Sequence, residues 1–211
     1  MTIRVVLADD HRMMRDALET VLREETDIEV VGTVDNGREA VALARELIPD
    51  VVVMDIAMPD LNGIEATARI VARDPGTRVI GLSTHGDKRY VLEMLKAGAA
   101  GYIAKASAAT ELIRAIRAVV RGEQYLCPRA TAEIATRSLD DAHPTAPPLS
   151  RREREVVQLV AEGLRTTEIA ERMHVAESTV EVHRRNIMQK LELRTVAELT
   201  KYAIREGLTS L

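Results

Sequence analysis

The chain has 211 residues, of which 46% are hydrophobic and 29% charged, so it fits a globular protein with two unequal domains. The net charge is −4 and the only aromatic residues are four tyrosines. Charge alone therefore does not indicate DNA binding, and the scarcity of aromatics argues against stacking on single-stranded nucleic acid. The single cysteine, Cys127, and the absence of any long apolar run predict a soluble cytoplasmic protein with no membrane partner.

Short apolar runs alternate with helical patterns through the first 121 residues. The runs are mostly rich in Val and Ile and too short for helices, which is typical of buried strands. They lie at Ile3–Ala8, Ile28–Val34, Val51–Met54, Val79–Leu82 and Gly101–Ala104. The helical patterns cover about 12–24, 37–47, 63–73, 87–97 and 109–121. This alternation predicts a doubly wound, flavodoxin-like α/β domain with a five-stranded parallel sheet in the order 2-1-3-4-5.

A polar segment follows this domain. It contains a short helical pattern at Arg129–Arg137, and then three prolines and two adjacent aspartates within Ser138–Pro148. Such a composition is typical of an extended or mobile tether. We therefore divide the chain into a first domain at 1–122, a linker at 123–148 and a second domain at 149–211.

The second domain is predicted to be a small all-α unit of four helices, at about 151–162, 167–173, 178–191 and 195–206. Ser150 and Glu153 have the spacing of a capping box before the first helix. The third helix has a predicted buried stripe at Val180, Arg184, Ile187 and Leu191. Its opposite side carries Ser178, Glu181, Val182, Arg185 and Gln189. That division is the geometry of a recognition helix in a DNA major groove.

Carboxylates follow two strands that the predicted order makes neighbours. Asp9 and Asp10 follow the first strand, and Asp55 follows the third. Because ligands bind at the carboxyl ends of parallel strands, we expect these groups to converge on one edge. Oxygen ligands select a hard divalent ion such as Mg²⁺, which would let one carboxylate attack a phosphoryl group. Lys105 and Ser83, at the ends of the fifth and fourth strands, would contact the same oxygens; the alternative is that these carboxylates only cap strand ends or helices.

The segments ADDH, MDIAMPDLNG, LST and GYIAK resemble the receiver domain of response regulators over about residues 3–121. The resemblance implies that Asp55 is the phosphoacceptor. It implies an acid pocket of Asp9 and Asp10, with Mg²⁺ held by Asp10, Asp55 and the Ala57 carbonyl. It also assigns phosphoryl contacts to Ser83 and Lys105, a switch role to Tyr102, and the turn after the phosphorylation site to Pro59 and Gly63. From the residues alone, Tyr102 fits a half-buried sheet position, and His11 and His85 are interpreted as surface polar residues.

The segments LSRREREVVQLVAEGL, EIA, STVEVH and KLELRT resemble the LuxR/NarL-type output domain over about residues 149–208. The DNA-binding set that we predict is Thr166, Thr167, Ser178, Thr179, Glu181, Val182, His183, Arg184, Arg185 and Lys190. Arg185 is the candidate for a bidentate base contact, whereas His183, Arg184 and Lys190 are expected to meet phosphates or solvent. The chain departs from the family at Glu181 and Thr167, where Lys is frequent, and at Ala176, where a capping Ser or Thr is usual.

Together the two resemblances imply a phosphorylation-activated transcription regulator of a bacterial two-component system. The expected partners are a cognate sensor histidine kinase, double-stranded promoter DNA and a second copy of the chain on activation. We expect no enzyme in the ordinary sense, although a receiver catalyses its own phosphorylation and dephosphorylation. Two alternatives are a metal-dependent phosphatase, which His11 disfavours because it replaces the expected second carboxylate, and a binding module whose first domain only dimerises.

Overall fold

A computed structural model describes residues 2–83, 88–135 and 149–209. The chain forms two compact units, Met1–Asp141 and Ala142–Leu211. Each has a hydrophobic core of its own. Among the described residues, no helix is long and apolar enough to cross a membrane.

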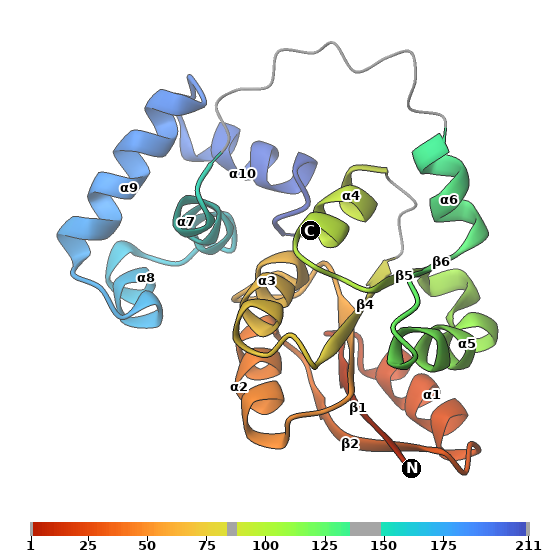
Figure 1. The fold of residues 1–211 in the computed structure, drawn as a ribbon. Coiled ribbons are helices and arrows are strands. Elements are labelled where there is room, and N and C mark those ends of the chain that lie inside the picture. The colour runs from red at the N-terminus through yellow and green to blue at the C-terminus, as the bar shows by residue number, and fades with distance from the viewer. Residues whose placement is uncertain (1, 84–87, 136–148, 210–211) are drawn as a thin grey trace. The chain divides into compact units, whose positions relative to one another are not determined.

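The first unit is built on a parallel sheet with the strand order β2-β1-β3-β4-β5-β6 (Figure 1). The strands are β1 Ile3–Ala8, β2 Ile28–Val34, β3 Val51–Asp55, β4 Arg78–Ser83, β5 Gly101–Ala104 and β6 Tyr125–Leu126. The first five confirm the predicted order. All five residues of the central strand β3 are buried, because helices cover both of its faces. This burial explains why its sequence is apolar without alternation.

Helices cover the two faces of this sheet. They are α1 Arg12–Arg23, α2 Gly37–Leu47, α3 Gly63–Arg73, α4 Lys88–Lys96 and α5 Ala108–Val120, with a 3₁₀ turn at Lys105–Ser107. Helices α1 and α5 contact each other on one face, whereas α2, α3 and α4 form a row on the other (Figure 1). Asn36 and Asn62 begin α2 and α3 by accepting hydrogen bonds from the backbone N–H groups of Glu39 and Glu65.

The start of the segment predicted as a linker is folded. Strand β6 pairs with β5, and helix α6, Pro128–Ala135, packs against α4 and β5. Cys127 and Ala130 are buried in the core of the first unit. The prediction of a five-stranded sheet that ends before residue 123 was therefore wrong by one strand. A run of two residues is too short to show strand periodicity.

The second unit is all helical, with α7 Arg151–Ala161, α8 Thr166–Met173, α9 Glu177–Lys190 and α10 Val196–Arg205. The predicted capping box is present, since the Glu153 N–H donates to Ser150 Oγ and the Ser150 N–H donates to Glu153 Oε2. A second capping box, formed by Thr195 and Glu198, begins α10. His174 ends α8 and Gly163 follows the end of α7, and both residues have a left-handed backbone conformation. This conformation keeps the turns after the two helices short.

Candidate functional site

Four predicted residues of the first unit gather at the carboxyl edge of the sheet. Asp9 follows β1, Asp55 ends β3, Ser83 ends β4 and Lys105 follows β5. The pairing of Ala8 with Met54 and of Asp55 with Leu82 places these strand ends side by side. All four residues are less than a tenth exposed. We call the group of Asp9, Asp10 and Asp55 the acid pocket.

The ammonium of Lys105 joins two carboxylates of the acid pocket. Its Nζ donates to Asp55 Oδ2 at 2.8 Å and lies 2.7 Å from Asp9 Oδ2. The pKa of Asp55 is raised from 3.8 to about 7, mainly by burial and secondly by repulsion from Asp9, whereas Lys105 lowers it. One ammonium thus does not neutralise the three carboxylates, and a further cation would lower their repulsion.

The carboxylates fit a divalent cation. Asp9, Asp10 and Asp55 each offer an oxygen, and these atoms together with a nitrogen of His11 lie within 4.8 Å of one another. Asp10 Oδ1 is buried and has no hydrogen-bond donor among the described residues. Hard oxygen ligands in this number suit Mg²⁺. The Ala57 carbonyl, two residues beyond Asp55, remains a predicted ligand.

The loop after Asp55 requires a glycine at its far end. A Cβ on Gly63 would lie 1.9 Å from the Asp55 carbonyl oxygen, so any larger residue would push the loop off the strand end. The Gly63 N–H instead donates to the Ile56 carbonyl at 2.8 Å. Asp60 adopts a left-handed conformation with φ 66°, which completes the turn around Pro59. The predicted turn residues therefore hold the phosphoacceptor strand end and the start of α3 together.

Tyr102 is buried, contrary to its interpretation from the residues alone. The side chain is 1% exposed, and its ring would lie 3.2 Å from a Cβ on Gly81 of the neighbouring strand. The missing side chain at Gly81 thus makes room for the ring and for Met94. The hydroxyl-bearing Ser83 is two residues further along β4, so the ring and the hydroxyl belong to the same pair of strands.

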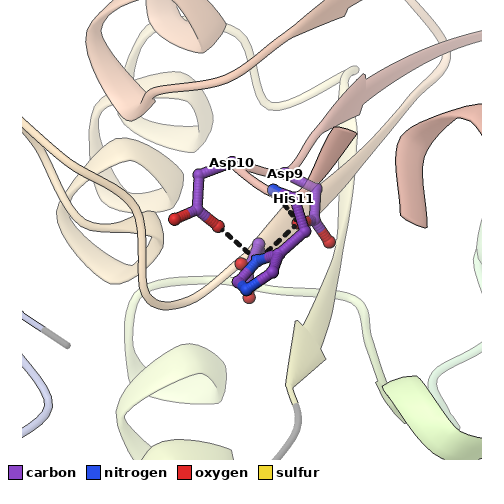
Figure 2. Close-up of side chains that lie close together, drawn as sticks. Asp9, Asp10 and His11 are labelled. Carbon is purple, nitrogen blue, oxygen red and sulfur yellow. Dashed lines mark hydrogen bonds and ion pairs between the residues drawn. The ribbon is translucent and has the colours of Figure 1, made fainter. Parts of the chain in front are cut away.

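His11 contacts the acid pocket, which the sequence interpretation missed (Figure 2). Its Nδ1 lies 2.7 Å from Asp10 Oδ1 and 3.4 Å from Asp9 Oδ1. The ring is 66% exposed, so it is a surface residue as predicted, but it faces the carboxylates. Its adjacency to the two aspartates was the available signal. His85, the other flanking histidine, lies outside the described residues.

Helix α9 has one buried and one exposed side, as its periodicity predicts. Val180 and Ile187 are fully buried, and Arg184 and Leu191 are half-buried. Ser178, Glu181, Val182, Arg185 and Gln189 are exposed. Val182 is among the few large hydrophobic side chains that are exposed, at 48%. This exposed side is long enough and polar enough to enter a major groove.

Two predicted phosphate contacts of α9 have partners within the second unit. Arg184 donates from Nη1 to Thr166 Oγ1 at 3.0 Å, which ties α9 to the start of α8. Lys190 Nζ lies 2.7 Å from Glu153 Oε1 and 2.9 Å from Oε2. By contrast, Glu181 and Arg185 make no ion pair with any described residue. Arg185 is thus an exposed basic side chain of α9 without an ion pair among the described residues.

The remaining members of the predicted DNA-binding set lie at the start of α8 and along α9. Thr166 and His183 are half-buried, Thr167 is exposed and Thr179 is half-buried. Ala176 begins α9 without a side-chain cap, as the missing Ser or Thr predicts. Nothing in the geometry tests which of these residues contact DNA, and the assignment of contacts remains a prediction.

A doubly wound sheet with an acid pocket at its carboxyl edge, followed by a helix-turn-helix unit, defines a response regulator with a DNA-binding output domain. The comparisons with known proteins agree. Residues 5–117 match the family described as "Response regulator receiver domain", and residues 147–203 match "Bacterial regulatory proteins, luxR family".

Relatives and a solved structure match this chain over most of its length. The chain is 39% identical to the uncharacterized transcriptional regulatory protein YxjL of Bacillus subtilis, over 98% of this chain and 97% of that one. It is 38% identical to the oxygen regulatory protein NreC of Staphylococcus carnosus, over 98% and 99%. A two-component response regulator of the LuxR family from Aurantimonas is 34% identical with a TM-score of 0.63, over 66% of this chain and 100% of that one.

The chain therefore belongs to the two-component response regulators with a LuxR-type output domain. Its function is transcription regulation through a receiver and a DNA-binding domain, and double-stranded DNA and a sensor kinase are the partners that these domains imply.

Proposed function

We propose that Asp55 accepts a phosphoryl group from the histidine of a sensor kinase, with Mg²⁺ in the acid pocket, and that this controls dimerisation and promoter binding. The observation that carries the proposal is the convergence of three carboxylates and Lys105 at the end of β3. Because Asp55 reaches a pKa of about 7 in this pocket without a metal, a bound cation would favour its ionised, nucleophilic form.

In the proposed step an Asp55 oxygen forms a bond to phosphorus while the bond from phosphorus to the donor breaks, and the donor leaves with that electron pair. Mg²⁺ held by Asp9, Asp10, Asp55 and the Ala57 carbonyl would neutralise charge on the transferring oxygens. Lys105 already contacts Asp55, and its ammonium would then pair with the oxygens of the new phosphoryl group. The receiver would also catalyse hydrolysis of the aspartyl phosphate, in which a water oxygen bonds to phosphorus while the bond from phosphorus to the Asp55 oxygen breaks, so that inorganic phosphate and the Asp55 carboxylate are released.

The phosphoryl group adds about 1.5–2 negative charges at the end of β3. Ser83 is buried at the end of the adjacent strand and would donate its hydroxyl to a phosphoryl oxygen. Movement of Ser83 would change the space beside Tyr102, because the Tyr102 ring packs against Gly81 on the same strand as Ser83. We infer that this pair of strands transmits the modification and shifts an existing equilibrium towards a dimer.

We infer that the dimer binds promoter DNA through the exposed side of α9, with Arg185 reading a base and the start of α8 meeting the backbone. A single output unit carries eleven basic and ten acidic residues at 150–211, so one unit alone offers few phosphate contacts. Pairing two units doubles those contacts. DNA as the target and the single reduced cysteine also favour the cytoplasm as the compartment.

The test combines mass and oligomeric state. The full chain is incubated with a small acyl phosphate, with and without Mg²⁺, and analysed by intact mass spectrometry and light scattering. We expect one added phosphoryl group, only with Mg²⁺, together with a rise in dimer. Asp55→Asn should lose both, and Asp10→Asn should slow labelling. Labelling of Asp55→Asn at the wild-type rate would overturn the assignment, and a labelled but unchanged monomer would overturn the switch.

A further inference from the structure

Arg184 is the charged member of the stripe on which α9 packs against α7 and α8 (Figure 1). Val180, one turn before it, and Ile187, one turn after it, are fully buried. The Arg184 side chain is half-buried, and its Nη1 donates to Thr166 Oγ1 at 3.0 Å. The guanidinium is thus directed at the first residue of α8 and not at the exposed side that carries Arg185.

This hydrogen bond determines which way the Thr166 hydroxyl points. A guanidinium carries donors only, so Thr166 Oγ1 is the acceptor and the hydroxyl hydrogen is left for another partner. That hydrogen points away from the positively charged Arg184, and the charged donor polarises the hydroxyl, which strengthens it as a donor. No acceptor for this hydrogen lies among the described residues.

Threonines inside other helices use the same hydrogen within their own helix. The hydroxyls of Thr20, Thr67 and Thr200 donate to the carbonyl four residues earlier, at 2.8, 2.6 and 3.0 Å. Thr166 is the first residue of α8, so the position four residues earlier lies before the helix begins. Its place in the helix thus explains why its hydroxyl keeps a donor that the described residues do not use.

We propose that Arg184 is a positioning residue for DNA binding, which holds the Thr166 hydroxyl as a donor to one phosphate of the DNA backbone. Threonine hydroxyls are frequent phosphate contacts, and such contacts fix the register of a protein on the duplex. Arg184 then acts through Thr166 and does not itself touch the phosphate. The inference rests on the proposed function, since it assumes that the start of α8 meets the backbone while the exposed side of α9 enters the groove.

A scan of the DNA backbone tests the pairing of this hydroxyl with a phosphate. The phosphorylated full chain first selects a duplex from a random pool. The duplex is then remade with one phosphate at a time replaced by a neutral methylphosphonate, and the affinity for each duplex is measured. Thr166→Val removes the hydroxyl at constant shape, Thr166→Ser retains it, and Arg184→Met removes the guanidinium but keeps an apolar stem. The double variant Thr166→Val/Arg184→Met completes the cycle.

Thr200→Val is the matched control. Thr200 is a half-buried threonine of the same unit, and its hydroxyl hydrogen is already bonded to the Val196 carbonyl. This variant should give the same scan as wild type. Circular dichroism and thermal unfolding of every variant check that the second unit is folded at the temperature of the binding measurement.

We expect one phosphate in each half-site whose replacement weakens wild type and Thr166→Ser by about tenfold or more, as is typical of a hydrogen bond to a charged group. Thr166→Val should be insensitive to that replacement, and Arg184→Met should lose most of the sensitivity at the same position. The affinity of the double variant should match that of Thr166→Val within about twofold, because Arg184 acts through the hydroxyl.

Two results would overturn the inference. A phosphate to which Thr166→Val remains sensitive, but Arg184→Met does not, would show that Arg184 contacts DNA directly. A scan profile like that of wild type in both single variants, whatever their overall affinity, would show that the bond between Arg184 and Thr166 only joins two helices.

Failure of the proposed function has a different signature. If no duplex is selected, or if Arg185→Ala binds the selected duplex as tightly as wild type does, the proposed DNA-binding side of α9 is wrong and both are overturned. If Arg185→Ala weakens binding while the scans of the Thr166 and Arg184 variants match wild type, only the inference fails.

Discussion

Asp55 carries an ionisable group at a position where its charge is unfavourable. Its pKa is about 7 in the folded chain, compared with 3.8 for an ordinary aspartate, mainly because it is buried and secondly because Asp9 repels it. Between these two values the folded state holds a proton that the unfolded state has lost. The free energy of unfolding should thus fall as the pH rises from about 4 to about 7, and then level off.

Asp55→Asn should therefore stabilise the receiver at pH 8 in the presence of a chelator, because it removes the buried charge. Relative to wild type, the gain should exceed that at pH 5 by about 2–3 kcal/mol, at about 1.4 kcal/mol for each unit of pKa. Urea unfolding curves of both proteins at the two pH values measure it. A difference that does not depend on pH would show that the carboxylate is ionised throughout this range.

Glu181 lies on the exposed side of α9, one turn before Arg185, and has no partner among the described residues. In the proposed orientation its carboxylate faces the DNA backbone and repels it. Glu181→Lys should then steepen the log–log salt dependence of dimer binding by up to about 2, at about 0.9 for each additional phosphate that the protein neutralises. Affinity for random duplex should rise more than affinity for a specific site.

Salt titrations of wild type and Glu181→Lys on both duplexes make this measurement. The matched control is Glu46→Lys, which adds the same charge on the exposed surface of α2 in the receiver. Equal slopes for wild type and Glu181→Lys would mean that Glu181 points away from DNA. A collapse of specific binding alone would instead make Glu181 a reader of a cytosine amine.

Among the elements, β6 and α6 attach the chain beyond residue 122 to the receiver. The Cys127 N–H donates to the Tyr102 carbonyl at 3.0 Å, so β6 is bonded to the strand that carries the predicted switch residue. Ala130 on α6 is 1% exposed. This attachment means that a change at β5 reaches β6 through backbone hydrogen bonds.

Ala130→Glu should therefore destabilise the receiver by about 2 kcal/mol or more, because it forces a charge without a partner into the core. Arg129→Glu, at the exposed neighbouring position, introduces the same side chain and should change stability by less than about 0.5 kcal/mol. Thermal unfolding of the two full-length variants tests this. Equal melting curves would indicate that α6 detaches from the receiver in solution.

At the scale of the whole molecule, the proposed dimer sets the geometry of the DNA site. Two copies of α9 related by a two-fold axis would enter successive major grooves, so half-sites should lie about 10 bp apart or an integral number of turns apart. Arg185→Ala should cost about 1–3 kcal/mol per base contact and relax the preference at one position of each half-site.

Footprinting of the phosphorylated protein on selected duplexes measures the spacing, and the same selection with Arg185→Ala measures the relaxed position. Arg205→Ala, on the exposed surface of α10, serves as the control for loss of one positive charge. Tight binding of monomer to an isolated half-site would contradict the dimer.

Local sequence was sufficient for the first five strands of the sheet, for the helices that cover them and for most of the acid pocket. The bounds of Ile3–Ala8, Ile28–Val34 and Gly101–Ala104 agree with the structure, because continuous apolar runs between helical patterns have one stable packing, a parallel sheet with covered faces. That topology in turn brings the strand ends together, so Asp9, Asp55 and Lys105 were predictable neighbours.

Only the tertiary structure decided the pairing of β6 with β5, the orientation of His11 towards the aspartates and the ion pair of Lys190 with Glu153. The last joins residues 37 apart in sequence and occupies a side chain that the helical pattern left available for DNA. The physical reason is common to all three. Periodicity reports which side of an element is buried, whereas these contacts depend on the distances and directions of groups that only packing brings together.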